Sequence, residues 1–152
     1  MNARLCLYIL IAMLGAGMGA ANAGQPKRQA GQASTVYKSP TCGCCAGWAE
    51  HLRKNGFDVT VVNKQQLGEI KTRYGIAPGL QSCHTAIVDG YAIEGHVPAN
   101  DIRRLLAERP KVTGLTAPGM PAQSPGMSGT EPKGYDVLSF ERNGRTRVFS
   151  SY

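Results

Sequence analysis

The central part of the chain carries short hydrophobic runs with the composition and alternation of β-strands. Side chains of a strand point alternately to its two faces, so an alternating, β-branched run such as FDVTVV indicates a strand. Four runs have this character: residues 35–39, 57–62, 85–88 and 91–97. Asp89-Gly90 joins the last two runs and predicts a tight hairpin, because this dipeptide favours two-residue turns.

Three other segments place apolar residues three and four positions apart, which is typical of one face of a helix. These segments are residues 44–55, a shorter stretch that ends at Gly75, and the stretch between Pro98 and Pro110. Trp48 and Leu52 lie on the apolar face of the first segment. Asn63 and Gln66 resemble a capping box and predict where the second helix begins.

The predicted order of elements is β-α-β-α-β-β-α, which indicates a mixed sheet with helices on its faces and hence an α/β sandwich. The first helix begins at a C-x-x-C motif, Cys42 to Cys45, as in thioredoxin-like folds. We therefore predict a thioredoxin-like α/β sandwich. This is an analogy of fold, so the function must be argued from the site.

The N-terminal residues predict an exported protein. Arg4 precedes an apolar run, and an A-x-A cleavage site ends at Ala23, so residues 1–23 are predicted to be a cleaved signal peptide. Residues 24–34 are polar and are expected to form a flexible tail, followed by a single domain over residues 35–152. No later apolar segment approaches the length of a membrane span, so we expect no membrane association after cleavage.

Two regions of different composition follow the third helix. Residues 110–134 are rich in proline and glycine and repeat the tripeptide Pro-Gly-Met at 118–120 and 125–127. A structureless loop of this length in a compact domain is either functional or disordered. Residues 135–152 contain two strand-like runs around an Asn-Gly turn and predict a C-terminal β-hairpin.

The chain is basic, with a formal net charge of +7 at pH 7. A positive excess of this kind also occurs in proteins that bind nucleic acid. Here the basic residues are scattered, and no aromatic residues are interleaved with them. We therefore expect a solvated basic surface and no nucleic-acid partner.

Four cysteines would remain after removal of the signal peptide, and three of them lie in the run CGCC. Cys42 and Cys45 are one turn apart at a predicted helix N-terminus, where the helix dipole stabilises a thiolate. Cys44, beside Cys45, has no evident use in an ordinary two-cysteine redox centre. Cys83 precedes the third strand, in the loop that faces the C-x-x-C motif of thioredoxin-like folds. That loop usually carries a cis-proline, but Pro78 is the nearest proline here.

These thiols admit several chemistries. Four cysteines in an exported protein allow two structural disulfides in any of three pairings, although the tight C-x-C-C spacing favours a metal site. Structural zinc prefers four well-separated ligands, whereas adjacent Cys44 and Cys45 suit sulfur atoms that each bridge two ions. Thiolates select soft Cu(I), so we favour several Cu(I) ions. A Cys42–Cys45 disulfide is still expected in the oxidised, metal-free protein, and copper binding would then need a reductant.

Three stretches together resemble the CopG-like family of exported copper-resistance proteins: YKSPTCGCCAGWAEHLRKNGFDV, GIAPGLQSCHTAIVDGYAIEGHVPANDIRRLL and APGMPAQSPGM. The resemblance implies a thioredoxin-like fold, a location in the periplasm of a Gram-negative bacterium, and a role in copper resistance that could include copper redox chemistry. Carried onto this chain, it implies that Cys42, Cys44, Cys45 and Cys83 bind copper.

Other donor atoms lie beside these cysteines or in the Pro-Gly-Met repeat. His84 follows Cys83 and is either a secondary copper ligand or a structural residue. Met120 and Met127 could offer thioethers to copper that enters or leaves, although a loop methionine more often covers apolar surface. His96 is expected to satisfy backbone groups near the start of the third helix.

We therefore predict a periplasmic Cu(I)-binding protein of copper resistance. Its partners would be copper ions, together with an electron donor or another periplasmic copper-handling protein if the copper cycles as in a copper oxidoreductase. Two alternatives stay open. One is a thiol–disulfide oxidoreductase that uses Cys42 and Cys45, and the other is a zinc- or disulfide-stapled module that binds a partner through the Pro/Gly/Met-rich segment.

Overall fold

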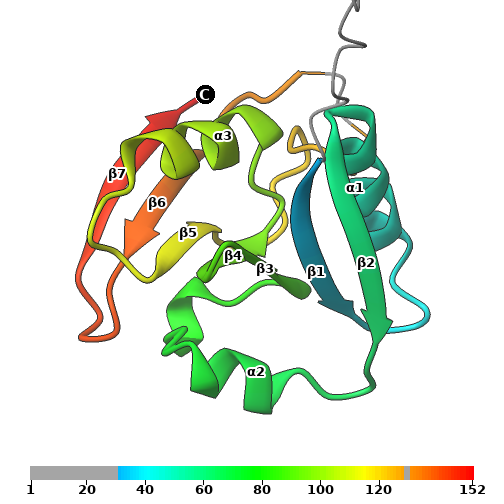
Figure 1. Ribbon diagram of the computed structural model, residues 1–152, viewed down its shortest axis with the longest axis horizontal. Coiled ribbons are helices and arrows are strands. Elements are labelled where there is room, and N and C mark those ends of the chain that lie inside the picture. Colours follow the sequence, from blue (N-terminus) through cyan, green and yellow to red (C-terminus); the bar gives the residue numbers. More distant parts are fainter. Residues whose placement is uncertain (1–30, 129–130) are drawn as a thin grey trace, which may run out of the picture.

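The computed structural model describes residues 31–128 and 131–152 as a mixed α/β fold built on one seven-stranded sheet (Figure 1). The strands are β1 (Gln32–Lys38), β2 (Phe57–Asn63), β3 (His84–Val88), β4 (Tyr91–Gly95), β5 (Gly114–Ala117), β6 (Asp136–Phe140) and β7 (Thr146–Ser151). The helices are α1 (Gly43–Lys54), α2 (Gly68–Arg73), α3 (Ala99–Glu108) and the short 3-10 helix η1 (Pro78–Leu80). The predicted α/β class is confirmed.

The sheet mixes parallel and antiparallel pairs in the order β2-β1-β3-β4-β5-β6-β7. β1 pairs in parallel with β2 and β4 with β5, while the other neighbours are antiparallel. Parallel neighbours need a crossover, and α1 and α3 supply these two crossovers. The β1–α1–β2 and β3–β4–α3 units are compatible with the thioredoxin-like arrangement predicted from the sequence.

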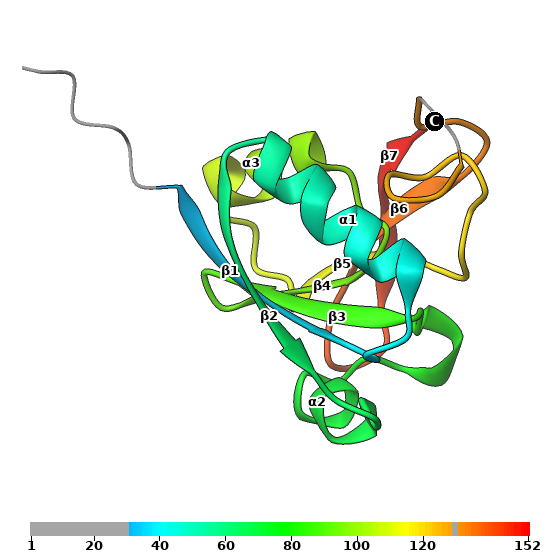
Figure 2. The ribbon, with the colours of Figure 1, turned by 90° about the vertical axis from the view of Figure 1, so that its right-hand side faces the viewer.

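The main core lies between the sheet and the two longer helices. α1 and α3 cover one face of the sheet, and α2 lies on the other (Figures 1 and 2). Trp48 and Leu52 of α1 are fully buried, as the helical spacing predicts, and they belong to the same cluster as Ile102 and Leu105 of α3. This packing fixes the N-terminus of α1 against one end of the sheet.

Element boundaries differ from the sequence predictions in two places. The flexible tail was expected over residues 24–34, but β1 begins at Gln32. Residues 32–34 therefore belong to a strand that pairs with β2. The predicted capping box at Asn63 and Gln66 is wrong, because α2 begins at Gly68 with Leu67 as its N-cap and no side-chain capping bond. Asn63 is instead the last residue of β2 and pairs with Lys38 of β1.

The proline- and glycine-rich stretch 110–134 is not a structureless loop. It contains β5, which pairs with both β4 and β6. This strand has only four residues and begins with Gly114, where a Cβ would lie 1.7 Å from the carbonyl oxygen of Ala92. So close an approach requires glycine. Because glycine has no side chain, this short strand lacks the alternating β-branched pattern that identifies strands in a sequence.

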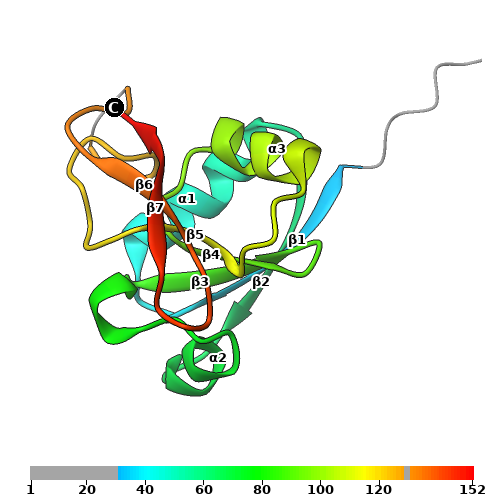
Figure 3. The same cartoon turned by 90° about the vertical axis from the view of Figure 1, so that its left-hand side faces the viewer.

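The predicted C-terminal hairpin is confirmed, and it extends the sheet beyond β5 (Figure 3). The predicted signal peptide, residues 1–23, lies outside the described residues. Within the part of the chain that the structure describes, no helix is long and apolar enough to cross a membrane.

Candidate metal centre

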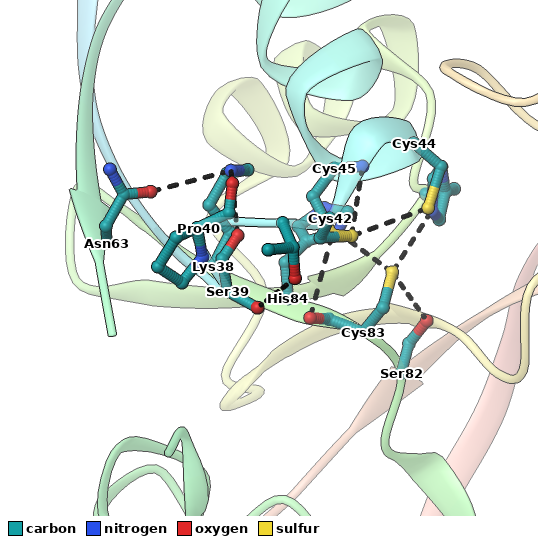
Figure 4. Close-up of a disulfide and its surroundings, with 12 residues drawn as sticks. Lys38, Ser39, Pro40, Cys42, Cys44, Cys45, Asn63, Ser82, Cys83 and His84 are labelled. Atoms are coloured by element: carbon teal, nitrogen blue, oxygen red, sulfur yellow. Dashed lines mark hydrogen bonds between the residues drawn. A yellow bond between two sulfur atoms is a disulfide. The ribbon is translucent and has the colours of Figure 1, made fainter. Parts of the chain in front are cut away.

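The four cysteines predicted to form the site come together from two separate segments (Figure 4). Three belong to the N-terminus of α1, and Cys83 comes from the loop before β3. One ligand atom from each of the four lies within 4.8 Å of all the others. The expected meeting of both segments at one point therefore occurs.

The N-terminus of α1 is capped by sulfur. Cys42 is the N-cap residue, and its Sγ accepts a hydrogen bond from the N–H of Cys45 at 3.4 Å. The same two residues form a disulfide, with their Cα atoms 5.4 Å apart. The disulfide agrees with the pairing expected for the oxidised, metal-free protein.

Cys44 and Cys83 are free thiols, and both are half-buried. Cys44 Sγ lies 3.5 Å from Cys42 Sγ, and Cys45 Sγ lies 3.7 Å from the carbonyl oxygen of Cys83. Burial raises the pKa of Cys83 to about 11, and the nearby Cys44 adds to the shift. Metal binding at Cys83 therefore has to displace a proton, because the thiolate is the ligand.

Two histidines lie against Cys83. Its Sγ is 3.4 Å from His84 Nδ1 and 3.3 Å from His96 Nε2. The three residues form a second group whose ligand atoms lie within 4.8 Å of one another. The ring of His84 also packs between Trp48 and His96, with ring centroids 4.4 Å and 5.0 Å away.

The hydrogen bonds of His96 determine which of its ring nitrogens carries the hydrogen and which presents a lone pair to Cys83 Sγ. Nδ1 lies 2.7 Å from the carbonyl oxygen of Pro125, which can only accept, so Nδ1 carries the hydrogen. Burial lowers the pKa of His96, which keeps the ring neutral. The unprotonated Nε2 therefore points at Cys83. A backbone carbonyl on Nδ1 with a free Nε2 is a common arrangement of metal-binding histidines.

His84 is the more deeply buried of the two histidines. Its pKa is lowered well below the usual value, first by burial and then by His96 and Lys71. Its Nε2 is among the buried polar atoms without a hydrogen-bond partner in the described residues. His84 is thus a neutral imidazole that faces Cys83 through Nδ1.

The Pro-Gly-Met loop, residues 118–127, lies beside the cysteine group. Ser82 Oγ donates to the carbonyl oxygen of Gly119 at 2.5 Å, and His96 donates to that of Pro125. Gly126 packs directly on α1: a Cβ there would lie 2.4 Å from the Trp48 nitrogen. The contacts place this loop at the site and favour the functional alternative over disorder.

The two methionines of the repeat differ in exposure. Met120 is 56% exposed, whereas Met127 is half-buried one residue after Gly126. Both are held near the site by the contacts of their neighbours in the loop.

Sequence reasoning missed the role of His96. It was expected to serve the start of α3, but its ring binds Pro125 and faces Cys83, so that expectation is wrong. The register of the β3–β4 hairpin could have revealed that His96 lies near Cys83. Val88 pairs with Tyr91, and each step along β3 and β4 keeps the pairing antiparallel. Continued two residues beyond the Thr85–Glu94 pair, the same register sets position 83 opposite position 96.

Two solved structures are similar to this chain, and they are described as "Copper resistance protein copG- Form 1" and "Form 2". Each has a TM-score of 0.74 and 40% sequence identity, and the match covers 80% of this chain and 98% of the solved chain. The chain belongs to the CopG-like family. A family model described as "Protein of unknown function, DUF411" matches residues 80–127 of this CopG-like chain. No curated protein matches it.

Proposed function

We propose that this protein serves copper resistance in the periplasm by holding several Cu(I) ions in a cluster bridged by cysteine thiolates. The observation that carries the proposal is the meeting of four cysteine sulfur positions, from the N-terminus of α1 and the loop before β3, within 4.8 Å of one another. The name of its structural relatives, copper resistance protein, supports the choice of copper. Export rests on the signal-like residues 1–23.

The spacing of the sulfur atoms favours bridged copper over a single zinc ion. Cys44 and Cys45 are adjacent in sequence, and the four ligand atoms are crowded together. Tetrahedral zinc keeps its ligands well apart, whereas Cu(I) prefers soft thiolates. Four thiolates that each bridge two ions would satisfy about four two-coordinate Cu(I) ions with no net charge. Neutrality lowers the cost of burying such a group.

Nitrogen and thioether donors surround the sulfur atoms. His96 Nε2 and His84 Nδ1 lie beside Cys83 and are neutral, so both suit a metal next to that sulfur. Met120 and Met127 lie in the docked Pro-Gly-Met loop and are candidates for copper transfer.

The disulfide links copper binding to redox chemistry. Cys42 and Cys45 become copper ligands only after an electron donor reduces their disulfide to two thiols. In the opposite direction, oxidation of the two thiolates to the disulfide releases two electrons, which reduce two Cu(II) ions to Cu(I). Copper redox activity of this kind would make the protein a copper oxidoreductase.

The Cys42–Cys45 disulfide also favours a second candidate function, thiol–disulfide exchange. A disulfide at a helix N-terminus is the usual arrangement for that reaction. This alternative predicts that Cys44 and Cys83 are dispensable, because exchange uses only the bridged pair.

Anaerobic titration with Cu(I) against a chromogenic chelator tests the proposal. The protein lacking residues 1–23 is fully reduced and compared with variants in which each of the four cysteines is changed to serine. We expect more than one copper ion per chain in the wild type, and a lower number in every variant. His96→Gln should weaken binding by about tenfold or more, whereas His51→Gln, a histidine of α1 outside the cysteine group, should leave it unchanged.

Three results would contradict the copper cluster. These are a single bound ion, a preference for zinc over Cu(I), and full copper binding after loss of Cys44 and Cys83. The last result, together with reduction of a disulfide substrate, would establish the thiol–disulfide alternative.

A further inference from the structure

A buried ion pair lies next to the loop that carries Cys83. Lys71 of α2 and Glu94 of β4 form this pair, and their side chains are only 8% and 0% exposed. Burial raises the pKa of the Glu94 carboxyl, and the charge of Lys71 opposes that shift. Removing two charges from water is costly, and apolar residues of similar volume often stabilise a fold at least as well. The pair therefore calls for a role other than stability.

Both charged groups bind the backbone of Ser82, the residue before Cys83. Glu94 Oε1 accepts a hydrogen bond from the Ser82 N–H at 2.6 Å, and Lys71 Nζ donates to the Ser82 carbonyl at 3.1 Å. Thr85 completes the network, because its hydroxyl donates to Glu94 Oε2 at 2.6 Å and lies 3.1 Å from Lys71 Nζ. The network thus holds the chain on both sides of Cys83.

The backbone around Ser82 is shaped to let it approach β4 closely. Gly95 has a φ of +71°, and a Cβ there would lie 2.7 Å from the Cβ and Oγ of Ser82 and 2.9 Å from the Ala117 carbonyl oxygen. The Ser82 hydroxyl in turn donates to Gly119 of the Pro-Gly-Met loop. Ser82 is therefore fixed through its N–H, its carbonyl and its hydroxyl.

We infer, on the basis of the copper site proposed above, that Lys71, Glu94 and Thr85 are positioning residues that hold Cys83 in place to complete the metal centre. None of the three is a metal ligand. They act through the backbone of Ser82 and through the start of β3.

Cys83 needs such support because it lies apart from the other three cysteines. Those three share the N-terminus of α1, so one helix fixes their relative positions. Cys83 lies between η1 and β3, and it must meet them from a separate segment. Functional groups need to be held within about half an ångström of their working geometry. The ion pair supplies fixed points directly beside this cysteine.

The first test needs no copper. In the protein lacking residues 1–23, with Cys44→Ser and the disulfide intact, Cys83 is the sole free thiol, so its alkylation rate reports how firmly it is held. We expect Glu94→Gln and Lys71→Met each to raise this rate about tenfold, since each leaves a buried charged partner unpaired and frees Ser82. Asp101→Asn, which alters another buried carboxylate on α3, should leave the rate unchanged.

The second test measures copper in the four-cysteine protein. Glu94→Gln and Lys71→Met should lower the number of bound Cu(I) ions and change the copper–thiolate absorption in the same way as Cys83→Ser. Thr85→Val and Thr85→Ser extend the test to variants with a smaller disturbance. Thr85→Val removes the hydroxyl and should show the same defect in milder form, and Thr85→Ser retains the hydroxyl and should behave as the wild type.

A purely structural network gives a different pattern. If Glu94→Gln and Lys71→Met lose as much stability as Asp101→Asn but keep the wild-type alkylation rate and copper absorption, the inference is overturned. It is also overturned if Thr85→Val behaves as the wild type does. If alkylation rises as expected but the wild type binds no Cu(I), then the positioning of Cys83 stands and the proposed copper function fails.

Discussion

The Pro-Gly-Met loop and the C-terminal hairpin both follow α3 in sequence and both pack onto the same fold, but different kinds of contact hold them. The loop is held through its main chain. The carbonyl oxygens of Gly119 and Pro125 accept hydrogen bonds from side chains of the fold, and the Cα of Gly126 lies against the backbone of α1. Figure 2 shows this loop beside the N-terminal end of α1.

The hairpin joins the sheet through the pairing of β6 with β5, and side chains attach it to α3. Ser150 and Tyr152 donate hydrogen bonds to the two carboxylate oxygens of Asp101, at 2.5 Å and 2.8 Å. The guanidinium group of Arg104 lies over the ring of Phe149, with its carbon 3.7 Å from the ring centroid. These contacts join β7 to α3 on the side of the molecule seen in Figure 3.

The difference separates the parts of the fold that serve the site from the parts that serve stability. The loop's main-chain contacts end on Ser82, on His96 and on the helix turn after the CGCC run, so each of them touches a neighbour of a cysteine. The side-chain contacts of the hairpin described above end on α3, and Arg142 in its turn donates to the carbonyl oxygen of Arg73 at the end of α2, away from the cysteines. We therefore expect changes in the loop to alter metal binding, and changes in the hairpin to alter stability alone.

The largest effect is expected for Gly126→Ala. Gly126 has a φ of +86°, and an added Cβ would meet the Trp48 nitrogen at 2.4 Å and the Cys44 carbonyl oxygen at 2.9 Å. Backbone strain and overlap together should lower the free energy of unfolding by about 3 kcal/mol, or undock the loop. Urea unfolding and Cu(I) titration should both detect the change.

Gly144→Ala is the matched control for this change. Gly144 lies in the turn of the hairpin with a φ of +85°, and a Cβ there meets nothing within 4 Å. Strain alone should cost about 1 kcal/mol, with no effect on copper. Equal loss of copper binding in both glycine variants would remove the distinction between the two regions.

Asp101→Asn should have an intermediate effect, confined to stability. It replaces a buried carboxylate that accepts from Ser150 and Tyr152, and hydrogen bonds to charged groups contribute about 2 kcal/mol. We expect urea unfolding to show a loss of about that size, with an unchanged number of bound Cu(I) ions. Asp136→Asn, on the exposed start of β6, should change neither quantity. A fall in copper binding in Asp101→Asn would contradict the separation.

Much of the fold follows from local pattern. Helical spacing located Trp48 and Leu52 on the buried face of α1, and Asp89-Gly90 marked the turn between β3 and β4. Such features depend on residues near one another in sequence. β5 could not be found in this way. Its first residue, Gly114, is required because Ala92 of β4 approaches it closely, and a glycine weakens the hydrophobic pattern of β5 itself.

The candidate site was predictable to the extent that its residues are chemically distinctive. A cluster of cysteines is easily recognised in a sequence, and the structure brings all four together. His96 and the Lys71–Glu94 pair give no such signal, because their roles depend on contacts between residues distant in sequence. Only the sheet register places His96 near Cys83, and only the position of α2 gives Glu94 its partner.

The smallest effect concerns the pH dependence of the hairpin. Burial and the hydrogen bond to Asp101 raise the pKa of Tyr152 to about 12, above its ordinary value of 10.0. Because the folded state holds this proton more tightly, the stabilising contribution is complete below pH 10 and is lost as the pH rises toward 12. Tyr152→Phe should therefore flatten the fall of unfolding free energy over this window in urea titrations of the metal-free protein. Tyr37→Phe, on β1, should retain the wild-type slope. An unchanged slope in Tyr152→Phe would show that this hydroxyl does not help to hold the hairpin on α3.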